Sequence, residues 1–331
     1  MKIARRQLLL SAAGLLALAA AAPLPALAAN TWPDRPINYV VPFAPGGATD
    51  ILGRMYAQYL GQALGVSVVV ENKPGTGGSL GTAYAARAKP DGYTLVGGTI
   101  SSHSINVSIY PSIGYDPVKS FAPVILTGTL PNVLVVRANS DYKTVDDLIK
   151  KARSKKDALT FGSSGVGSSQ HLAGELFAQD IGAHMLHVPY KGSAPSLQAL
   201  AAGDIDLLFD NITSALPLIQ SGKLRALAVT SSQPAAMLPG VKPLKDFGNG
   251  LEHYEVVSWQ AVFAPAGTPR PIIDKLYAVM HATLQKPEVQ KRLQGLGITI
   301  SGAGPDELAA FQKAEVAKWA AVAAKGHIKL H

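Results

Sequence analysis

Residues 37–64 read "INYVVPFAPGGATDILGRMYAQYLGQAL", and this stretch decides the fold. It opens with an apolar run typical of a strand, Ile37–Val41, and from about Asp50 its apolar residues recur every three or four positions, as in an amphipathic helix. The linking loop, within "VPFAPGGATD" at 41–50, holds two prolines and two glycines. Such a loop serves as a turn, as a phosphate cradle, or as half of another binding site.

The same alternation of short strand and helix continues along the chain, which favours a parallel α/β architecture. The strands are expected at Ile37–Val41, Val66–Glu71, Tyr93–Gly97, Val133–Arg137, Leu159–Gly162, Met185–Val188, Ile205–Phe209, Leu224–Val229 and Ala261–Ala264. The helices are expected from about Asp50, from about Ser79, and at Val145–Ser154, His171–Asp180, Ser196–Ala202, Thr213–Ser221, Pro271–Leu284, Pro287–Leu296 and Pro305–Ala324. The last three begin with proline, which suits the first helical turn.

The N-terminus has the pattern of a secretory signal peptide. Lys2, Arg5 and Arg6 precede an apolar run, and small residues at Ala26 and Ala28 offer a cleavage site. We expect residues 1–29 to direct export to the periplasm by the Sec or the twin-arginine route. The chain has no cysteine, so cysteine catalysis and thiolate metal sites are excluded.

Charge gives little support to nucleic-acid binding. Loss of Lys2, Arg5 and Arg6 lowers the formal net charge from +8 to +5. The densest basic run, "KKARSKK" at 150–156, follows two aspartates. Acids at the start of a helix and bases at its end complement the helix dipole on a solvated face. No nucleic-acid partner is expected.

Catalytic, metal and cofactor motifs are incomplete. "KPGTGGSLG" at 73–81 has Leu80 where a dinucleotide fingerprint needs glycine, and it lacks the Gly-Lys-Ser/Thr of a P-loop. "FGSSGVGSSQHL" at 161–172 lacks the nucleophile elbow G-x-S-x-G, although His171 stands near its serines. His184 and His187 would face opposite sides of a strand. We expect no catalytic residue, no metal and no cofactor.

The serine-rich stretch 161–172 is better interpreted as an anion site. A strand ends near Gly162, a helix capped by Ser168 or Ser169 follows, and hydroxyls and glycines lie between. The N-terminus of a helix offers free N–H groups and a positive dipole end to an anion. The loop at 41–50 has the same form. Two such junctions predict a ligand held between two α/β lobes, at the carboxyl ends of the strands.

The chain also resembles a known family through motifs that occur in order over nearly all of the mature sequence. These are "WPDRPINYVVPFAPGGATDILGR", "VVVENKPGTGGSLGT", "KPDGYTLVGGT", "YDPVKSFAPV", "SSGVGSSQHLAGELF", "HVPYKGSAPSLQALAAGDIDLLFDN", "SGKLRALAVTS" and "APAGTPRPIIDKL". Together they resemble the Bug-type extracytoplasmic solute receptors of tripartite tricarboxylate transporters. The resemblance implies a two-lobed fold of the periplasmic-binding-protein type II kind, with a ligand cleft between the lobes.

The resemblance further implies a discontinuous first lobe, residues 30–130 plus 256–331, and a second lobe, 131–255. It implies a monomer that performs no chemistry and delivers a small carboxylate to membrane transporter subunits. The ligand-binding residues that it implies are Phe43, Gly46, Gly47, Asp50, Ser101, Ser102, His103, Ser163, Ser164, Gly167, Ser168, Ser169, Tyr190 and Asp210. For Asp50 and Asp210 the alternative is that each only caps a helix.

The sequence therefore predicts a periplasmic solute-binding protein for a small carboxylate. Di- and tricarboxylates, amino-acid-like acids and aromatic acids all remain open as ligands. An exported serine-dependent hydrolase using the loop at 161–172 is one alternative. A sensor subunit that presents its ligand to a membrane signalling partner is another.

Overall fold

A computed structural model describes residues 32–325. The signal peptide expected at residues 1–29 lies outside them. The chain divides into two units, Met1–Asp34 and Arg35–His331, and the fold given below is that of residues 35–325. None of the described helices is long and apolar enough to cross a membrane. The described residues contain no cluster of three His, Cys, Asp or Glu side chains able to hold a metal ion.

The opening stretch forms the expected strand, loop and helix. Strand β1 covers Ile37–Val41, as predicted, and α2 covers Ala48–Leu64, two residues earlier than expected. A Cβ atom at Gly53 would lie 3.0 Å from side-chain atoms of both Tyr39 and Val41, so this glycine lets the helix pack closely on the strand. Gly65 ends the helix in the left-handed conformation, with φ +71°.

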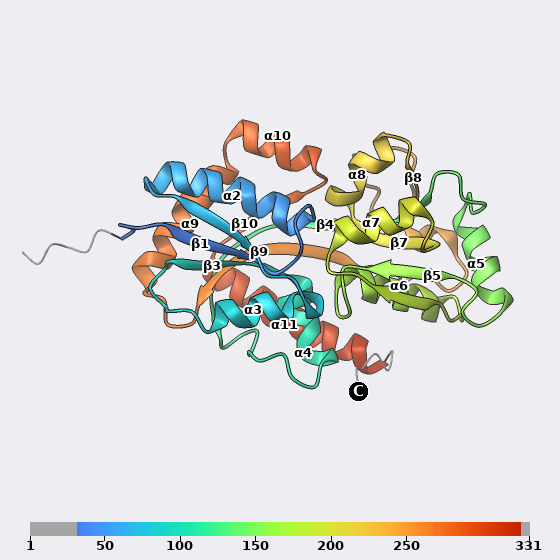
Figure 1. Cartoon of the computed structure of the whole chain (residues 1–331), viewed down its shortest axis with the longest axis horizontal. Helices are drawn as coiled ribbons and strands as arrows, with labels where there is room; N and C mark the ends of the chain where they lie inside the picture. The colour runs from blue at the N-terminus through green and yellow to red at the C-terminus, as the bar shows by residue number, and fades with distance from the viewer. Residues whose placement is uncertain (1–31, 326–331) are drawn as a thin grey trace, which may run out of the picture. The chain divides into compact units, whose positions relative to one another are not determined.

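The strands form one connected sheet system (Figure 1). Their order is β2-β1-β3-β9-β4-β7-β5-β6, and β8 and β10 also pair with β4. The remaining bounds are β2 (Val68–Asn72), β3 (Thr94–Thr99), β4 (Phe121–Arg137), β5 (Thr160–Ser163), β6 (Leu186–Pro189), β7 (Leu207–Asn211), β8 (Leu224–Val229), β9 (Val257–Pro265) and β10 (Thr299–Ala303).

The predicted α/β class is confirmed, but the sheet is mixed rather than wholly parallel. β1 pairs in parallel with β2 and β3, and β5 pairs in parallel with β6 and β7. Every pairing made by β4 or β9 is antiparallel. Helices join the consecutive strands of each parallel group, as α2 joins β1 to β2 and α6 joins β5 to β6, because a parallel arrangement requires a crossover connection.

Strand β4 joins two groups of strands. Its first part, Phe121–Pro131, pairs with β9, and its second part, Asn132–Arg137, pairs with β7 and β8. We call β1, β2, β3, β9 and β10 the first strand group, and β5, β6, β7 and β8 the second. The change of partner lies beside the lobe boundary expected at 130/131, and the chain enters β9 just after the boundary expected at 255/256. The division into two lobes stays a prediction.

Helices flank both strand groups. Their bounds are α3 (Ser79–Ala86), α4 (Asn106–Ile109), α5 (Val145–Ser154), α6 (Ser169–Asp180), α7 (Ser193–Ala202), α8 (Ile212–Gln220), α9 (Arg270–Leu284), α10 (Pro287–Gly295) and α11 (Pro305–Lys325), with short turns η1 (Thr76–Gly78), η2 (Ser101–Ile105, a π-helix) and η3 (Leu244–Phe247). The expected range of α5 is confirmed, and α9, α10 and α11 start within one residue of their predicted prolines.

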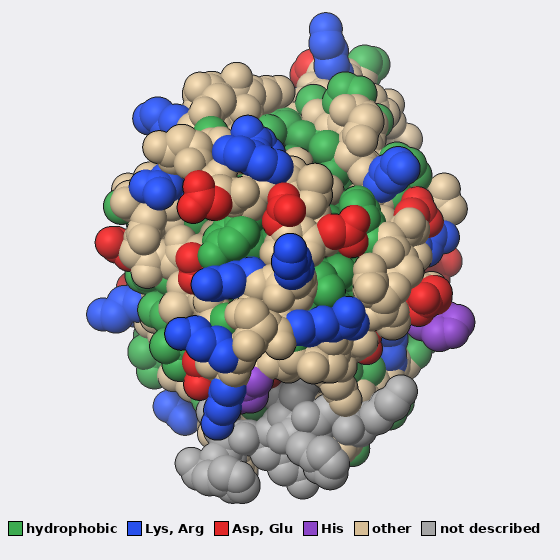
Figure 2. Space-filling view, turned by 90° about the vertical axis from the view of Figure 1, so that its right-hand side faces the viewer, with side chains coloured by type: hydrophobic (Ala, Val, Ile, Leu, Met, Phe, Trp, Pro, Cys, Tyr) green, Lys and Arg blue, Asp and Glu red, His purple; other side chains and the backbone are tan. Residues whose placement is uncertain are grey.

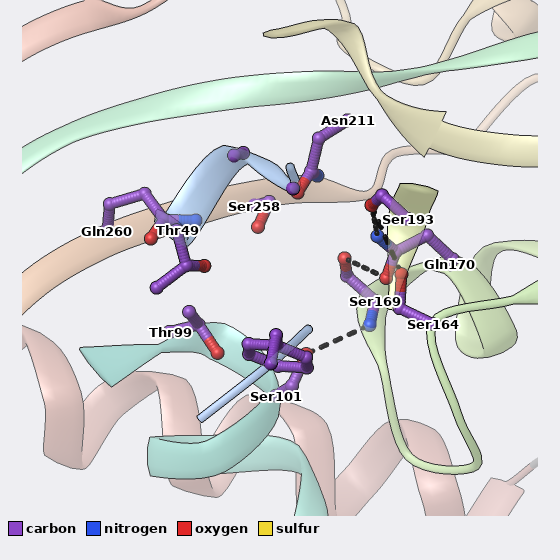
Figure 3. Close-up of a pocket in the computed structure, with 13 residues that line it drawn as sticks. Thr49, Thr99, Ser101, Ser164, Ser169, Gln170, Ser193, Asn211, Ser258 and Gln260 are labelled. Carbon is purple, nitrogen blue, oxygen red and sulfur yellow. Dashed lines mark hydrogen bonds between the residues drawn. The ribbon is translucent and has the colours of Figure 1, made fainter. Parts of the chain in front are cut away.

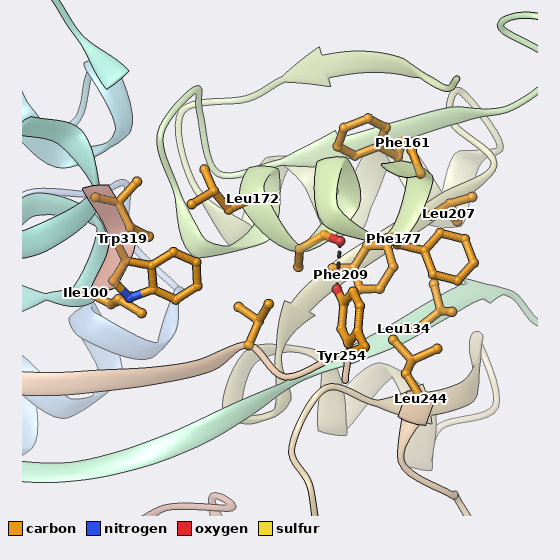
Figure 4. Close-up of a cluster of buried hydrophobic side chains, with 14 of the residues drawn as sticks. Ile100, Leu134, Phe161, Leu172, Phe177, Leu207, Phe209, Leu244, Tyr254 and Trp319 are labelled. Atoms are coloured by element: carbon orange, nitrogen blue, oxygen red, sulfur yellow. Dashed lines mark hydrogen bonds between the residues drawn. The ribbon is translucent and has the colours of Figure 1, made fainter. Parts of the chain in front are cut away.

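The apolar core fills the space between sheet and helices. In the second strand group Phe177 packs against Phe209 with ring centroids 5.6 Å apart, and the buried Tyr254 hydroxyl donates to the Ala173 carbonyl at 2.6 Å (Figure 4). In the first, Trp259 of β9 and Trp319 of α11 both donate to one Glu315 carboxylate oxygen, at 3.1 and 3.0 Å. This shared acceptor fixes α11 against β9.

The surface charge agrees with the solvated-face interpretation of the basic run. On the face drawn in Figure 2, Lys and Arg side chains lie among Asp and Glu side chains. Helix α5 carries Asp146 and Asp147 in its first turn and Lys151 and Arg153 in its last. Asp147 and Thr144 also form a reciprocal capping box. Helix geometry thus accounts for this charge pattern.

Candidate functional site

A small cavity lies where loops of the two strand groups meet (Figure 3). Its volume is about 20 Å³. Figure 3 shows Thr49, Thr99 and Gln260 on one side of it and Gln170 and Ser193 on the other. All its lining side chains are uncharged: Phe43, Gly47, Ala48, Thr49, Thr99, Ser101, Ser164, Ser169, Gln170, Ser193, Asn211, Ser258 and Gln260.

Helix N-termini supply most of this lining. Gly47 is the N-cap of α2, Asn211 is the N-cap of α8, and Ser101, Ser169 and Ser193 are the first residues of η2, α6 and α7. The first N–H groups of a helix have no acceptor within it, and the aligned peptide dipoles place partial positive charge there. The helix ends therefore direct partial positive charge at a cavity that no cationic side chain lines.

Asp50 shapes the first loop, residues 43–50. Its carboxylate accepts from the Gly46 N–H at 2.9 Å, from Asn72 Nδ2 at 2.9 Å and from Arg54 Nε at 3.1 Å. Asn72 Nδ2 also donates to the Phe43 carbonyl at 3.0 Å. Burial opposes ionisation, but the bonds from Arg54, Gly46 and Asn72 outweigh it and lower the pKa of Asp50. Asp50 is buried and lies outside the cavity lining.

Two adjacent histidine rings, tilted by 30° to each other, support the second loop, residues 163–169. The rings of His171 and His187 lie 4.1 Å apart between centroids. Ser163 Oγ lies 2.7 Å from His187 Nε2, and the Gly167 N–H donates to His171 Nδ1 at 3.3 Å. Burial, followed by the neighbouring His171, lowers the pKa of His187 to about 3. His171 Nε2 also lies 3.5 Å from Glu175 Oε1, one turn further along α6.

Within the second loop only Ser164 and Ser169 line the cavity. Ser168 caps α6 by accepting from the His171 N–H at 3.2 Å, as one of the two caps considered. Ser163 accepts from the Gly165 N–H at 3.0 Å. Gly167 has φ +79°, and a Cβ there would lie 2.2 Å from Asn106 Oδ1. Ser163, Gly167 and Ser168 thus hold the loop's shape.

The segment Ser101–His103 divides between lining and core. Ser101 lines the cavity and accepts from the Ser169 N–H at 3.1 Å, which joins the two strand groups. Ser102 Oγ lies 2.9 Å from His103 Nδ1. The His103 ring stacks on Phe263 at 4.1 Å, and burial lowers its pKa to about 3. Ser102 and His103 are buried behind the cavity wall and do not line it.

The structure places Gly46, Tyr190 and Asp210 outside the lining as well. Gly46 has φ +87° and packs near Ala194, 3.3 Å from where its Cβ would stand. Tyr190 is half-buried, and its N–H donates to the Ser163 carbonyl at 3.0 Å. Asp210 is buried directly behind Ser193, whose hydroxyl donates to it at 2.7 Å. Ligand contacts at these residues stay a prediction.

Main-chain contacts close the rim of the cavity. The Ala44 N–H donates to the Lys191 carbonyl at 3.3 Å, and a Cβ at Gly192 would lie 3.0 Å from that of Ala44. On another part of the rim a Cβ at Gly77 would lie 2.1 Å from the Val166 carbonyl oxygen. Only glycine permits this approach. The loops of the two strand groups therefore touch each other across the rim.

Five of the predicted residues line the cavity: Phe43, Gly47, Ser101, Ser164 and Ser169. Sequence reasoning missed eight others: Ala48, Thr49, Thr99, Gln170, Ser193, Asn211, Ser258 and Gln260. Ser193 and Asn211 stand at strand-to-helix junctions of the same form as the two that were recognised. Ser258 and Gln260 alternate along β9, so they share one face of an otherwise apolar strand. These two patterns are visible in the sequence and could have identified Ser193, Asn211, Ser258 and Gln260 as lining residues.

Comparison with known proteins agrees with this architecture. The family model described as "Tripartite tricarboxylate transporter family receptor" matches residues 52–327. Protein BugT of Bordetella pertussis is 35% identical over 305 residues, which is 92% of this chain and 93% of BugT.

Solved structures of similar proteins superpose closely. The periplasmic binding protein BugD is 36% identical, with a TM-score of 0.86 over 90% of this chain and 100% of BugD. R. palustris Rpa4515 with adipate is 37% identical, with a TM-score of 0.87 over 90% and 100% of the two chains. MatC of Rhodopseudomonas palustris with bound malate is 33% identical, with a TM-score of 0.84 over 88% and 99%. This chain belongs to the receptor family of the tripartite tricarboxylate transporters.

Proposed function

We propose that the protein is a receptor that binds a small carboxylate in the cavity between its two strand groups. The convergence of helix N-termini on an uncharged cavity is the observation that carries the proposal. Hydrogen bonds to a charged group contribute about 1.5–3 kcal/mol each, so three or four suffice for micromolar affinity, which needs about −8 kcal/mol. Adipate in Rpa4515 and malate in MatC are ligands of this chemistry.

The ligand carboxylate would lie against main-chain N–H groups rather than a cation. In the first loop the donors are those of Gly47, Ala48 and Thr49 at the start of α2. From the opposite side the hydroxyls of Ser164 and Ser169 would complete the grip. Thr99, Ser258 and Gln260 are placed to contact the remainder of the ligand.

Ligand entry requires the rim to open. A cavity of about 20 Å³ has room for about one water. Small-molecule pockets are commonly about 300–1,000 Å³. We therefore infer that the two strand groups separate to admit the acid and close around it. Only a ligand that binds the closed form more tightly can shift that equilibrium.

Calorimetry tests the binding function. The mature chain is titrated with acetate, benzoate, malate, adipate, aspartate and citrate, and thermal unfolding is followed with each. We expect at least one acid to bind with a micromolar dissociation constant and to raise the melting temperature. If all six fail at millimolar concentration, carboxylate binding is wrong.

The side chains of the second loop give a sharper test. Ser164 and Ser169 line the cavity, and we expect a Ser164→Ala, Ser169→Ala variant to bind at least tenfold more weakly with unchanged unfolding. Ser154→Ala is a matched control, since that hydroxyl ends α5 away from the site. Equal affinities in all three proteins would remove these serines from the site.

The contact between Ser163 and His187 is the one that a serine hydrolase would need between its nucleophile and its base. Ser163 has no exposed surface, and a pKa of about 3 makes His187 a weak base near neutral pH. We infer that this pair supports the loop and performs no catalysis. A serine-reactive fluorophosphonate should leave Ser163 unmodified; its labelling would favour the hydrolase.

We also infer that the receptor works in the periplasm and delivers its ligand to membrane transporter subunits, as family membership favours. Deletion of the protein should abolish uptake of its acid by cells while the membrane subunits are still made. Unchanged uptake with lost transcriptional response would instead favour the sensor role.

A further inference from the structure

Asp210 is a buried carboxylate that contacts the residues of the cavity wall, near the end of β7. Its side chain has no exposed surface. One oxygen, Oδ1, accepts from Ser193 Oγ at 2.7 Å, from the Asn211 N–H at 2.7 Å and from Gln170 Nε2 at 3.4 Å. The other oxygen, Oδ2, is buried and has no hydrogen-bond partner among the described residues. All three donors belong to residues that line the cavity.

These contacts direct the lining donors away from an incoming anion. While Asp210 is ionised it can only accept hydrogen bonds, so it holds the Ser193 hydroxyl proton and a Gln170 amide proton on its own side. Asn211 Nδ2 is likewise occupied by an acceptor outside the lining, since it donates to Asn132 Oδ1 at 2.5 Å. With its proton held by Asp210, Ser193 Oγ can only accept hydrogen bonds, and Ser164 Oγ and Gln170 Nε2 lie 3.2 and 3.5 Å from it. The Ser193 oxygen would meet a carboxylate with its lone pairs, which is the wrong polarity.

No cationic side chain within residues 32–325 forms an ion pair with Asp210. Strand β7 packs against β4, β5, α6, α7 and α8. The titratable side chains on these elements are Arg137 at the far end of β4 and His171, Glu175 and Asp180 on α6. None of them contributes to the pKa of Asp210, which burial raises to about 6 against the opposing bonds from Ser193, Gln170 and Asn211. A second negative charge in the cavity would raise it further.

We propose that binding of a dicarboxylate is coupled to uptake of one proton by Asp210. The proton comes from the solvent and forms an O–H bond at the carboxyl group. A protonated Asp210 can donate to Ser193, which frees the Ser193 and Gln170 protons to face the ligand. Asp210 is then a positioning residue that sets the polarity of the wall, and the inference rests on the proposed function.

Calorimetry in two buffers measures this proton directly. Malate and adipate are titrated at pH 7 and pH 8 in phosphate and in Tris, which differ in ionisation enthalpy. We expect close to one proton taken up per ligand at pH 8. The dissociation constant should rise about tenfold from pH 7 to pH 8, as coupling to one proton requires.

Asp210→Asn is the decisive variant, because an amide keeps an acceptor oxygen and adds a donor, as the protonated acid does. It should bind with no proton uptake, with equal affinity at pH 7 and pH 8, and more tightly than the wild type at pH 8. Asp204→Asn, at an exposed carboxylate before the same strand, should keep the wild-type proton uptake and pH dependence.

Two outcomes would overturn the coupling. One is binding heat in the wild type that is the same in both buffers at pH 8. The other is a pH dependence that persists unchanged in Asp210→Asn. Since the buffer comparison needs only wild-type protein, the test does not depend on the variant's folding. Absence of binding by every acid of the panel would overturn the carboxylate function itself, which is a distinguishable result.

Discussion

At the scale of single residues, the two buried aspartates near the site have opposite relations to pH. Asp50 has partners on both oxygens and a lowered pKa, whereas Asp210 has one unpartnered oxygen and a raised pKa. A lowered pKa means that ionisation stabilises the fold, and a raised pKa means that ionisation destabilises it.

Replacement of Asp50 by Asn should destabilise the fold at neutral pH. An amide loses acceptor capacity toward Gly46, Arg54 and Asn72, and a hydrogen bond to a charged group contributes about 1.5–3 kcal/mol. Because the folded pKa of Asp50 is lowered, this difference should be full above about pH 4 and shrink as the pH falls further. Denaturant unfolding of both proteins at pH 7 and pH 3 measures it. If the difference in unfolding free energy between wild type and variant were the same at pH 7 and pH 3, the lowered pKa assigned to Asp50 would be wrong.

Replacement of Asp210 by Asn should stabilise the ligand-free protein at pH 8. The pKa of Asp210 rises from 3.8 to about 6 on folding. At about 1.4 kcal/mol per pKa unit, ionisation then costs the wild type about 3 kcal/mol above pH 6. The cost should vanish as the pH falls toward 4. Denaturant unfolding of the ligand-free variant at pH 8 and pH 4 checks both the sign and the window.

At the scale of elements, the glycines of the rim decide whether the loops can meet. Gly77→Ala would place a Cβ 2.1 Å from the Val166 carbonyl oxygen, so closure should fail and ligand affinity should fall at least tenfold. Gly65→Ala is the matched control, because Gly65 also has positive φ but has no atom within 4 Å of the added Cβ.

Both glycine variants should lose about 1–2 kcal/mol of folding free energy through left-handed strain. Only Gly77→Ala should lose affinity, which separates closure from backbone strain. Calorimetry together with denaturant unfolding provides the two readouts. Equal affinity in the two variants would show that this rim contact is dispensable for binding.

Element boundaries were predictable where local pattern and tertiary structure agreed. Ile37–Val41, Leu224–Val229 and Val145–Ser154 match their elements because an apolar period or a capping box defines each one locally. The first part of β4 was missed, since Pro123, Gly128 and Pro131 interrupt its pattern and are accommodated beside register shifts or at the change of partner strand.

Lining residues could be predicted only in short segments where a strand ends and the next helix begins. Phe43 and Gly47 satisfied that condition, as did Ser164 and Ser169. Ser258 and Gln260 reach the cavity from a strand about 90 residues beyond the second loop, so tertiary assembly places them there. His103 stood in a polar motif, but its ring completes an aromatic cluster with Phe263 instead.

At the scale of the whole molecule, opening and closing of the strand groups can be controlled chemically. The chain has no cysteine, so two introduced cysteines can form a disulfide only with each other within the chain. Ala44 and Gly192 face each other across the rim without lining the cavity, and a small shift brings their Cβ atoms to disulfide distance, about 3.5–4.5 Å.

The oxidised Ala44→Cys, Gly192→Cys protein should exclude ligand, because a cavity of about 20 Å³ cannot widen once the rim is linked. Reduction should restore binding in the same sample. Ala44→Cys alone, treated with the same oxidant, should bind normally. Full affinity of the linked protein would mean that the acid enters without separation of the strand groups.

The uncharged lining has a consequence for how such receptors diversify. When helix ends in the main chain meet the ligand's charge, a substitution at Thr49, Thr99, Ser258 or Gln260 leaves anion recognition in place. Successive substitutions at these positions can then change which acid the receptor prefers, while every intermediate sequence still binds a carboxylate. A pocket that holds its anion through one arginine would lose anion binding when that arginine is replaced.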